Sequence, residues 1–169
     1  YSYFTDEDTF SYFQGVKSHN TVYRASEKYS MRKLSRFVFG SWTKGSWSIL
    51  GEDTLVIRFK NMFSEHLERT LDFQKNRIIV CDRTTGSVSG DFVSGITLNC
   101  ISLKASTETS GEKITSEAEF ESSDKFSIYS SCRSVISDVP VSFCYGNKVL
   151  RKRVEFQMKN QEVKFEIRF

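Results

Sequence analysis

Strict alternation of apolar and polar side chains is the feature that most constrains how this chain folds. The last eight residues, EVKFEIRF, place every apolar side chain at an odd position and every charged one at an even position. The same rhythm occurs in TLVIRF (54–59) and RVEFQM (153–158), with further candidate segments at 114–121 and 125–131. A period of two predicts β-strands with one face on a core and the other in water.

Turn signals separate these strands roughly every ten to twelve residues. They include GED, TSGEK, SSDK and YGNK, and the last predicts a hairpin. Residues 24–34 carry helix formers without an apolar stripe, so we expect a short turn or irregular segment there. A chain of 169 residues is long enough to bury a full core. The sequence therefore predicts one all-β domain over 1–169, an antiparallel β-sandwich of many strands with at most one short helix.

Charge and composition exclude several classes of function. The net charge is +3, with 24 basic and 21 acidic residues interspersed, so a nucleic-acid partner is not expected. The run RKR at 151–153 lies within an alternating strand and is predicted to be a solvated sheet face. No apolar run is long enough to span a bilayer, and no signal peptide is present. The absence of an initial Met indicates an internal start, so these features do not locate the parent protein.

The four cysteines predict buried thiols rather than a metal knuckle. None of Cys81, Cys100, Cys132 and Cys144 has C-x-x-C spacing, and each lies in or near an apolar run. One or two disulfides are compatible with an exported chain, but the sequence does not choose among three pairings.

Few residues in the sequence are candidates for catalysis or for ligand binding. The two histidines, His19 and His66, stand outside any catalytic motif and are by themselves more typical of structural positions. Trp42 and Trp47 lie close to two glycines in the sequence and are candidates either for stacking on sugar rings or for the core. Basic residues that favour an anionic sugar over a neutral one are Arg24, Lys28, Arg32, Lys33 and Arg36.

Two segments resemble a known enzyme family. Residues 1–40, which begin YSYFTDEDTFSYFQGVKSHNTVY, resemble the start of the C-terminal β-sheet region of heparinase II/III-like polysaccharide lyases. The matching positions are Tyr1, Tyr3, Tyr12, Phe13, Gly15, His19, Asn20, Thr21 and Val22. HLERTLDFQKNRIIVCDRTTG (66–86) resembles a later strand pair of the family through His66, Arg69, Asp82 and Gly86.

The resemblance implies a part in a larger enzyme. Family members join an α/α-toroid to stacked antiparallel β-sheets and cleave uronate-containing polysaccharides by β-elimination. The resemblance implies an acidic polysaccharide as partner, a periplasmic or extracellular location, and a zinc ligand at His19. We expect Asn20, Trp42 and Trp47 to contact the substrate.

The chain also departs from the family pattern. GVK (15–17) stands where family members usually have G-T-x-A ahead of the residue that corresponds to His19. GITLN (95–99) lacks a histidine that some members carry on the corresponding strand. The segments that supply the family's catalytic residues and remaining metal ligands, including the toroid, are missing. β-Elimination needs a base, an acid and a neutralised carboxylate, and no cluster here provides all three. We therefore expect no catalytic residue in this chain, an inactive and metal-free fragment, and zinc, if any, in the full-length parent.

Two alternatives remain open at this point. One is a non-catalytic carbohydrate-binding or scaffold β-domain. The other is an adhesion or capsule-assembly module, which would show a large exposed apolar patch.

Overall fold

The computed structural model describes residues 7–29, 34, 45–86, 90–98, 103–108, 111–116, 126–144 and 147–169. The helical elements of this part are α1 (Glu7–Gln14) and the 3-10 turn η1 (Val16–Ser18). The strands are β1 (Val22–Arg24), β2 (Gly45–Leu50), β3 (Thr54–Lys60), β4 (His66–Gln74), β5 (Arg77–Thr85), β6 (Phe92–Leu98), β7 (Leu103–Glu108), β8 (Gly111–Ser116), β9 (Ser127–Ser130), β10 (Ser134–Cys144), β11 (Asn147–Gln157) and β12 (Glu162–Arg168). The predicted all-β fold with one short helix is confirmed.

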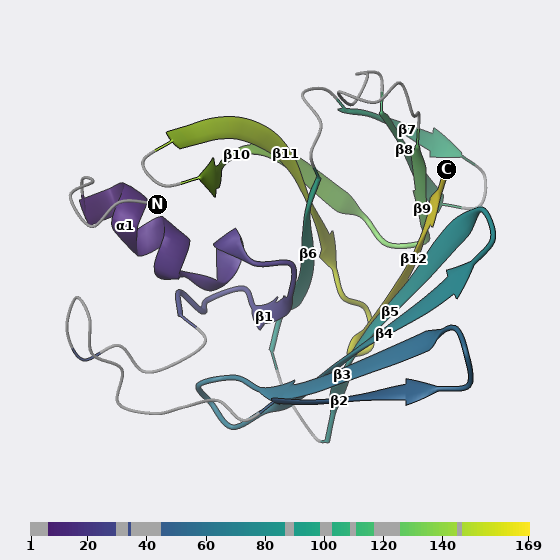
Figure 1. Ribbon diagram of the computed structural model, residues 1–169, viewed down its shortest axis with the longest axis horizontal. Helices are drawn as coiled ribbons and strands as arrows, with labels where there is room; N and C mark the ends of the chain where they lie inside the picture. The colour runs from purple at the N-terminus through teal and green to yellow at the C-terminus, as the bar shows by residue number, and fades with distance from the viewer. Residues whose placement is uncertain are drawn as a thin grey trace.

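The strands form two antiparallel sheets that face each other (Figure 1). The small sheet has the order β1-β6-β11-β10, and the large sheet has the order β2-β3-β4-β5-β12-β9-β8-β7. The predicted hairpin joins β10 and β11, whose register runs from Ser134 opposite Phe156 to Cys144 opposite Asn147. Pro140, the single proline, lies on β10 at the edge of the small sheet, where a residue without an N–H costs no interior ladder bond.

The main core lies between the two sheets and follows the period-two pattern. Val163 and Phe165 of β12 face Val154 and Phe156 of β11, and all four are buried. The Phe156 and Phe165 rings stack with centroids 4.5 Å apart. A smaller cluster, Val22, Leu67 and Phe92, joins β1, β4 and β6. Burial on one face of each strand is what fixes the register of both sheets.

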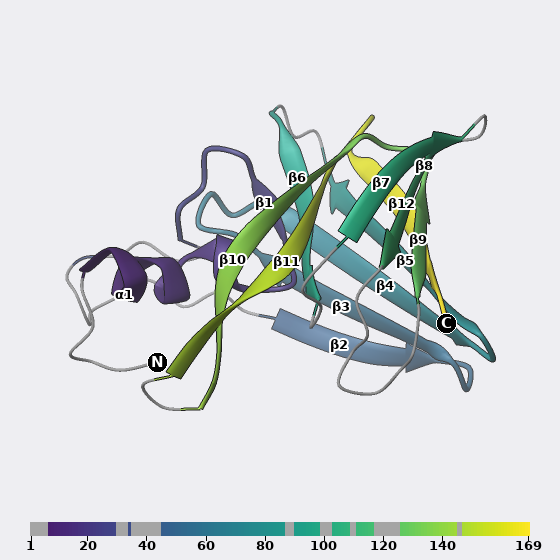
Figure 2. The ribbon, with the colours of Figure 1, turned by 90° about the horizontal axis from the view of Figure 1, so that it is seen from above.

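Helix α1 was not predicted from the sequence, because a segment of eight residues is too short for the helical repeat of apolar side chains to be recognised. Glu7 and Asp8 in its first turn suit the positive helix N-terminus, and Phe10 is buried. The helix lies beside the β10–β11 hairpin, at the end of the molecule away from the C-terminus (Figure 2). Within residues 24–34, the described part around Ala25 and Ser26 is a turn, as expected. Among the described residues, no helix is long and apolar enough to cross a membrane.

Candidate functional site

The His19–Asn20 loop connects η1 to β1 and is shaped by local hydrogen bonds. The Ser18 hydroxyl donates to the carbonyl of Gly15 at 2.8 Å, and the His19 N–H donates to the carbonyl of Val16 at 3.2 Å. A Cβ at Gly15 would lie 2.9 Å from the carbonyl oxygen of Lys28, so only glycine allows this close backbone approach. The loop therefore reaches β1 with part of the His19 residue exposed to solvent and part of it buried.

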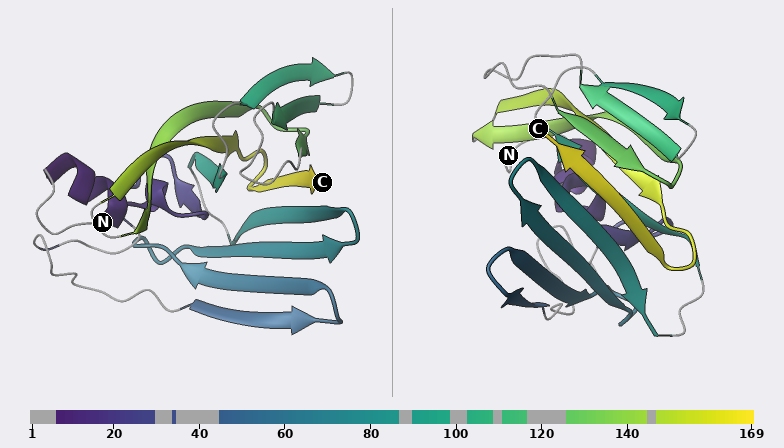
Figure 3. Two further views of the ribbon diagram at one scale, coloured as in Figure 1. Left: turned by 45° about the horizontal axis from the view of Figure 1, so that its top comes forward. Right: turned by 90° about the vertical axis from the view of Figure 1, so that its right-hand side faces the viewer.

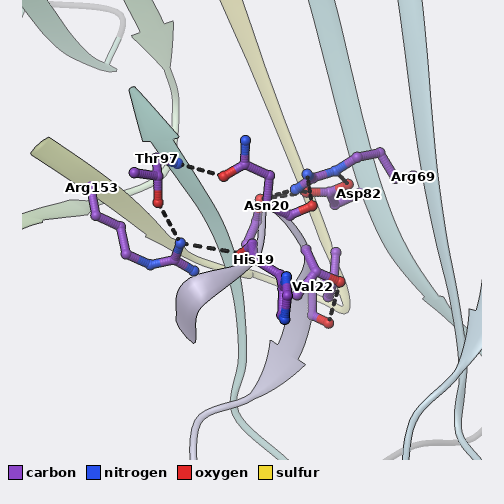
Figure 4. A network of polar contacts seen from close by, with 9 residues as sticks. His19, Asn20, Val22, Arg69, Asp82, Thr97 and Arg153 are labelled. Carbon is purple, nitrogen blue, oxygen red and sulfur yellow. Dashed lines mark hydrogen bonds and ion pairs between the residues drawn. The ribbon is translucent and has the colours of Figure 1, made fainter. Parts of the chain in front are cut away.

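A buried ion pair in the large sheet holds the loop from one side (Figure 4). Arg69 of β4 and Asp82 of β5 are direct cross-strand neighbours, and two N–H groups of Arg69 donate to the two Asp82 carboxylate oxygens at 2.7 Å each. A third N–H of Arg69 donates to the carbonyl of Asn20 at 2.8 Å. The Ser94 hydroxyl also donates to Asp82. The two halves of the 66–86 motif thus meet at the loop that carries His19.

Arg153 of β11 holds the loop from the small sheet. Its guanidinium donates to the carbonyl of His19 at 3.2 Å, to the Thr97 hydroxyl at 3.0 Å and to the Glu155 carboxylate at 2.9 Å. The residue is only 1% exposed. The expectation that 151–153 forms a solvated face is therefore wrong for Arg153, because the loop after α1 covers this face of β11.

Asn20 contributes a second attachment. Its side-chain carbonyl accepts the Thr97 N–H at 2.7 Å, which leaves the amide nitrogen able to donate elsewhere (Figure 4). Nothing in the linear sequence joins Asn20 to Thr97 or Arg153, since the three lie on segments far apart. These positioning residues were missed because only the fold brings them to the loop.

Burial and nearby charge set the protonation of the loop. Burial, and then the Arg153 guanidinium, lower the pKa of His19 below its ordinary value. Burial raises the pKa of Tyr23 strongly, and the hydrogen bond that Tyr23 donates to Glu155 raises it further. Burial raises the pKa of Glu155, but the bonds from Tyr23 and Arg153 outweigh it and leave a net lowering. The loop therefore carries a neutral imidazole beside a fixed cation at neutral pH.

We expect this lowered pKa to be measurable. The folded state disfavours imidazolium, whereas the unfolded chain binds a proton near pH 6.5. Stability should therefore fall as pH drops below about 6.5, until the folded-state pKa of His19 is passed. NMR titration of the His19 ring gives that pKa, and His19→Gln should flatten this part of a urea-denaturation profile. A His19 pKa at or above the ordinary value would contradict the assignment.

A cavity of about 460 Å³ opens next to the loop. Its polar lining includes His19, Asn20, Ser142 and Arg151, and its apolar lining includes Phe13 and other side chains. The cavity lining thus combines a cation, an amide and an imidazole.

The aromatic candidates lie elsewhere. Trp47 on β2 is 71% exposed and lines a separate cavity with Gly45, Ser46, Leu55 and Ile57. Trp42 lies outside the described residues. His66, on β4, is exposed and opposite Thr85, in keeping with a polar sheet face. The structure therefore brings together His19 and Asn20, while Trp47 does not share their cavity.

The described residues do not by themselves fit a zinc ion. Zinc needs three or four converging ligands, and within these residues no group of three His, Cys, Asp or Glu side chains could hold a metal. Cys81 and Cys132 are free thiols, and burial raises the pKa of Cys81, which disfavours the thiolate that binds metals. The Arg153 cation beside His19 also opposes a second positive charge. His19 as a zinc ligand stays a prediction.

Comparisons with known proteins add the fold relationship. No protein-family model and no curated protein sequence matches the chain. Heparan sulfate lyase HepC from Pedobacter heparinus superposes with a TM-score of 0.66 at 17% identity, over 99% of this chain and 27% of that chain. Two heparinase III structures superpose over 99% of this chain, one with a TM-score of 0.68 at 17% identity over 26% of its length, the other with 0.67 at 14% over 25%.

These matches show that the chain shares its fold with about a quarter of the length of the solved lyases. The resemblance expected from the sequence is confirmed at the level of the fold. It extends over almost the whole chain, beyond the segment of about 90 residues in which motifs could be matched.

Proposed function

We propose that this chain forms the β-sandwich wall of a glycan cleft in a polysaccharide lyase that cleaves uronate-containing acidic polysaccharides by β-elimination. The observation that carries the proposal is the His19–Asn20 loop, which Arg69 and Arg153 fix at the rim of the 460 Å³ cavity. The fold around it is shared with solved structures of a heparan sulfate lyase and of heparinase III, which supports the choice of enzyme class.

The cavity wall has the chemistry to hold an acidic sugar. Arg151 supplies a permanent cation that can pair with a uronate carboxylate or a sulfate group. The Asn20 amide donates to hydroxyl or carboxylate oxygens, and a neutral His19 imidazole can donate or accept one hydrogen bond. These groups bind and orient the sugar. Arg151 also adds positive charge near the sugar carboxylate, which favours the developing anion of an elimination reaction.

The reacting groups are proposed to come from the rest of the enzyme. Proton abstraction at the uronate carbon and protonation of the leaving oxygen need two positioned groups besides the carboxylate-binding one. Of the titratable groups, His19 and Arg151 line this cavity among the described residues. The isolated chain is therefore proposed to be inactive. The resemblance to the lyase family is the basis for proposing that the whole enzyme acts in the periplasm or outside the cell. No step requires a metal held by this chain.

The test compares the full-length encoded protein with the isolated chain on heparan sulfate, chondroitin sulfate and alginate. Appearance of unsaturated product, followed by ultraviolet absorbance, should occur with the full-length protein alone. Arg151→Ala should raise KM about tenfold, because a hydrogen bond to a charged group is worth roughly 1.5–3 kcal/mol. Arg133→Ala removes an exposed arginine outside the cavity and should leave KM unchanged.

The possible results separate the proposed function from its alternative. Binding of acidic oligosaccharides by the full-length protein without any cleavage would favour a carbohydrate-binding or scaffold domain. If Arg151→Ala and Arg133→Ala changed KM equally, the cavity would have no part in substrate recognition, even if the enzyme cleaved its substrate.

A further inference from the structure

One cross-strand row on the inner face of the large sheet runs from the core out to solvent. The register places Phe165, Val80, Leu71, Leu55 and Ile49 opposite one another in turn, on β12, β5, β4, β3 and β2. The first two are core residues, the next two are partly buried, and Ile49 is 60% exposed. At the β12 end of this row the side chains pack in the core. At the β2 end, no layer of the described residues covers the side chains of the same face.

The neighbouring row behaves in the same way. Asp82, Arg69, Ile57 and Trp47 are successive partners, with Asp82 fully buried and Trp47 71% exposed. We call the four outer residues of the two rows, Trp47, Ile49, Leu55 and Ile57, the apolar shelf. A cavity of about 450 Å³ lies over part of it. In Figure 3, β2 and β3 lie at the margin of the large sheet, away from β10 and β11.

The shelf continues an existing sheet-to-sheet interface. Val22 of β1 packs on Leu67 of β4, so the small sheet reaches as far as β4 in the described structure. Strands in a layer are about 4.8 Å apart, and two facing sheets lie about 10 Å apart. A layer extended beyond β1 would therefore lie over β3 and then β2, with its apolar face on the shelf.

The chemistry of the shelf favours protein over sugar. Its four side chains carry one polar group, the Trp47 indole N–H, whereas a sugar needs several donors and acceptors for its hydroxyls. Leu and Ile side chains instead match the apolar face of another strand pair. Because the hydrophobic gain grows with the apolar area removed from water, covering these four side chains together makes a substantial docking surface.

We propose that the apolar shelf seats the apolar face of further β-strands that belong to the same lyase polypeptide and lie outside this chain. The inference rests on the proposed function, because the solved lyases that share this fold are about four times as long as the matched region. The shelf is then an internal interface of the whole enzyme rather than a substrate surface, and it would leave Trp47 out of sugar binding.

Thiol accessibility tests this proposal. Ile49→Cys places a thiol on the shelf, and Glu52→Cys places one at the exposed turn of the same β2–β3 hairpin. Each variant is made in the isolated chain and in the full-length encoded protein, and maleimide labelling of that peptide is followed by mass spectrometry. We expect Ile49→Cys to react at least about tenfold more slowly in the full-length protein, since a buried site reacts only through local opening. Glu52→Cys should react at the same rate in both.

Three results would overturn the proposal. Equal labelling of Ile49→Cys in both proteins would leave the shelf open to solvent. Slow labelling in the isolated chain at low concentration would mean that the chain covers its own shelf. Protection that increases with the concentration of the isolated chain would assign the shelf to a second copy.

Lyase activity is measured on the same samples. An active full-length enzyme with an accessible Ile49→Cys thiol would refute the docking proposal alone. A protected thiol in a protein that cleaves no uronate polymer would refute the proposed function alone.

Discussion

Asp82→Ala is expected to destabilise the chain by about 3–5 kcal/mol, because it leaves the buried Arg69 guanidinium without its carboxylate. Asp82 is fully buried and accepts two bonds from Arg69 at 2.7 Å. An unpaired buried charge costs far more than the net value of the pair. Urea denaturation followed by circular dichroism measures the loss. Hydrogen exchange at the Asn20 loop should quicken as well, because Arg69 then holds the Asn20 carbonyl less firmly.

Asp138→Ala is the matched control. Asp138 pairs with Lys152 at 2.8 Å, but its side chain is 54% exposed, and such surface pairs are worth at most about 1 kcal/mol. The double variant Arg69→Met with Asp82→Leu should regain much of the lost stability, since it leaves no unpaired charge. If Asp82→Ala cost no more than Asp138→Ala, the ion pair would not be the element that fixes the loop.

Gly95→Ala is expected to be the second most damaging change, at about 2–3 kcal/mol, because it overfills a packed layer. A Cβ at this position would lie 1.9 Å from one guanidinium nitrogen of Arg153 and 2.6 Å from its central carbon. Arg153 is buried and bonded to His19, Thr97 and Glu155, so it cannot withdraw without losing those bonds. Thermal and urea unfolding measure the loss.

Gly45→Ala is the comparison for this effect. Gly45 lies on β2, where the nearest atom to an added Cβ is 3.6 Å away, and we expect a change within about 0.5 kcal/mol. His19 provides a second readout, because Arg153 lowers its pKa. Displacement of Arg153 in Gly95→Ala should therefore raise the His19 pKa, which Gly45→Ala should not do. A stable Gly95→Ala variant with an unchanged His19 pKa would refute the close contact.

Glu68 illustrates what the alternating pattern could and could not predict. Alternation along β4 places Leu67, Arg69 and Leu71 on one face of the sheet and Glu68 on the other. It did not indicate that Glu68 would be buried on the polar face, between Arg58 at 2.6 Å and Arg83 at 2.5 Å. Burial of a paired charge depends on the residues opposite it on the two adjacent strands, which a period of two along one strand cannot report.

The sequence by itself predicted the alternating strands at 54–59, 153–158 and 162–169 and their inward faces, because side-chain period and turn residues act locally along the chain. It predicted the kinship in fold only through its resemblance to a family pattern. It also singled out His19, Asn20, Arg69 and Asp82 through their resemblance to a family pattern. Only the tertiary structure decided that Arg69 and Arg153 hold the two carbonyls of one loop, that Arg153 is buried, and that the core rows end in an exposed shelf. Each of these depends on which strands become neighbours, and the fold brings together residues as far apart in the chain as His19 and Arg153, which no local pattern connects.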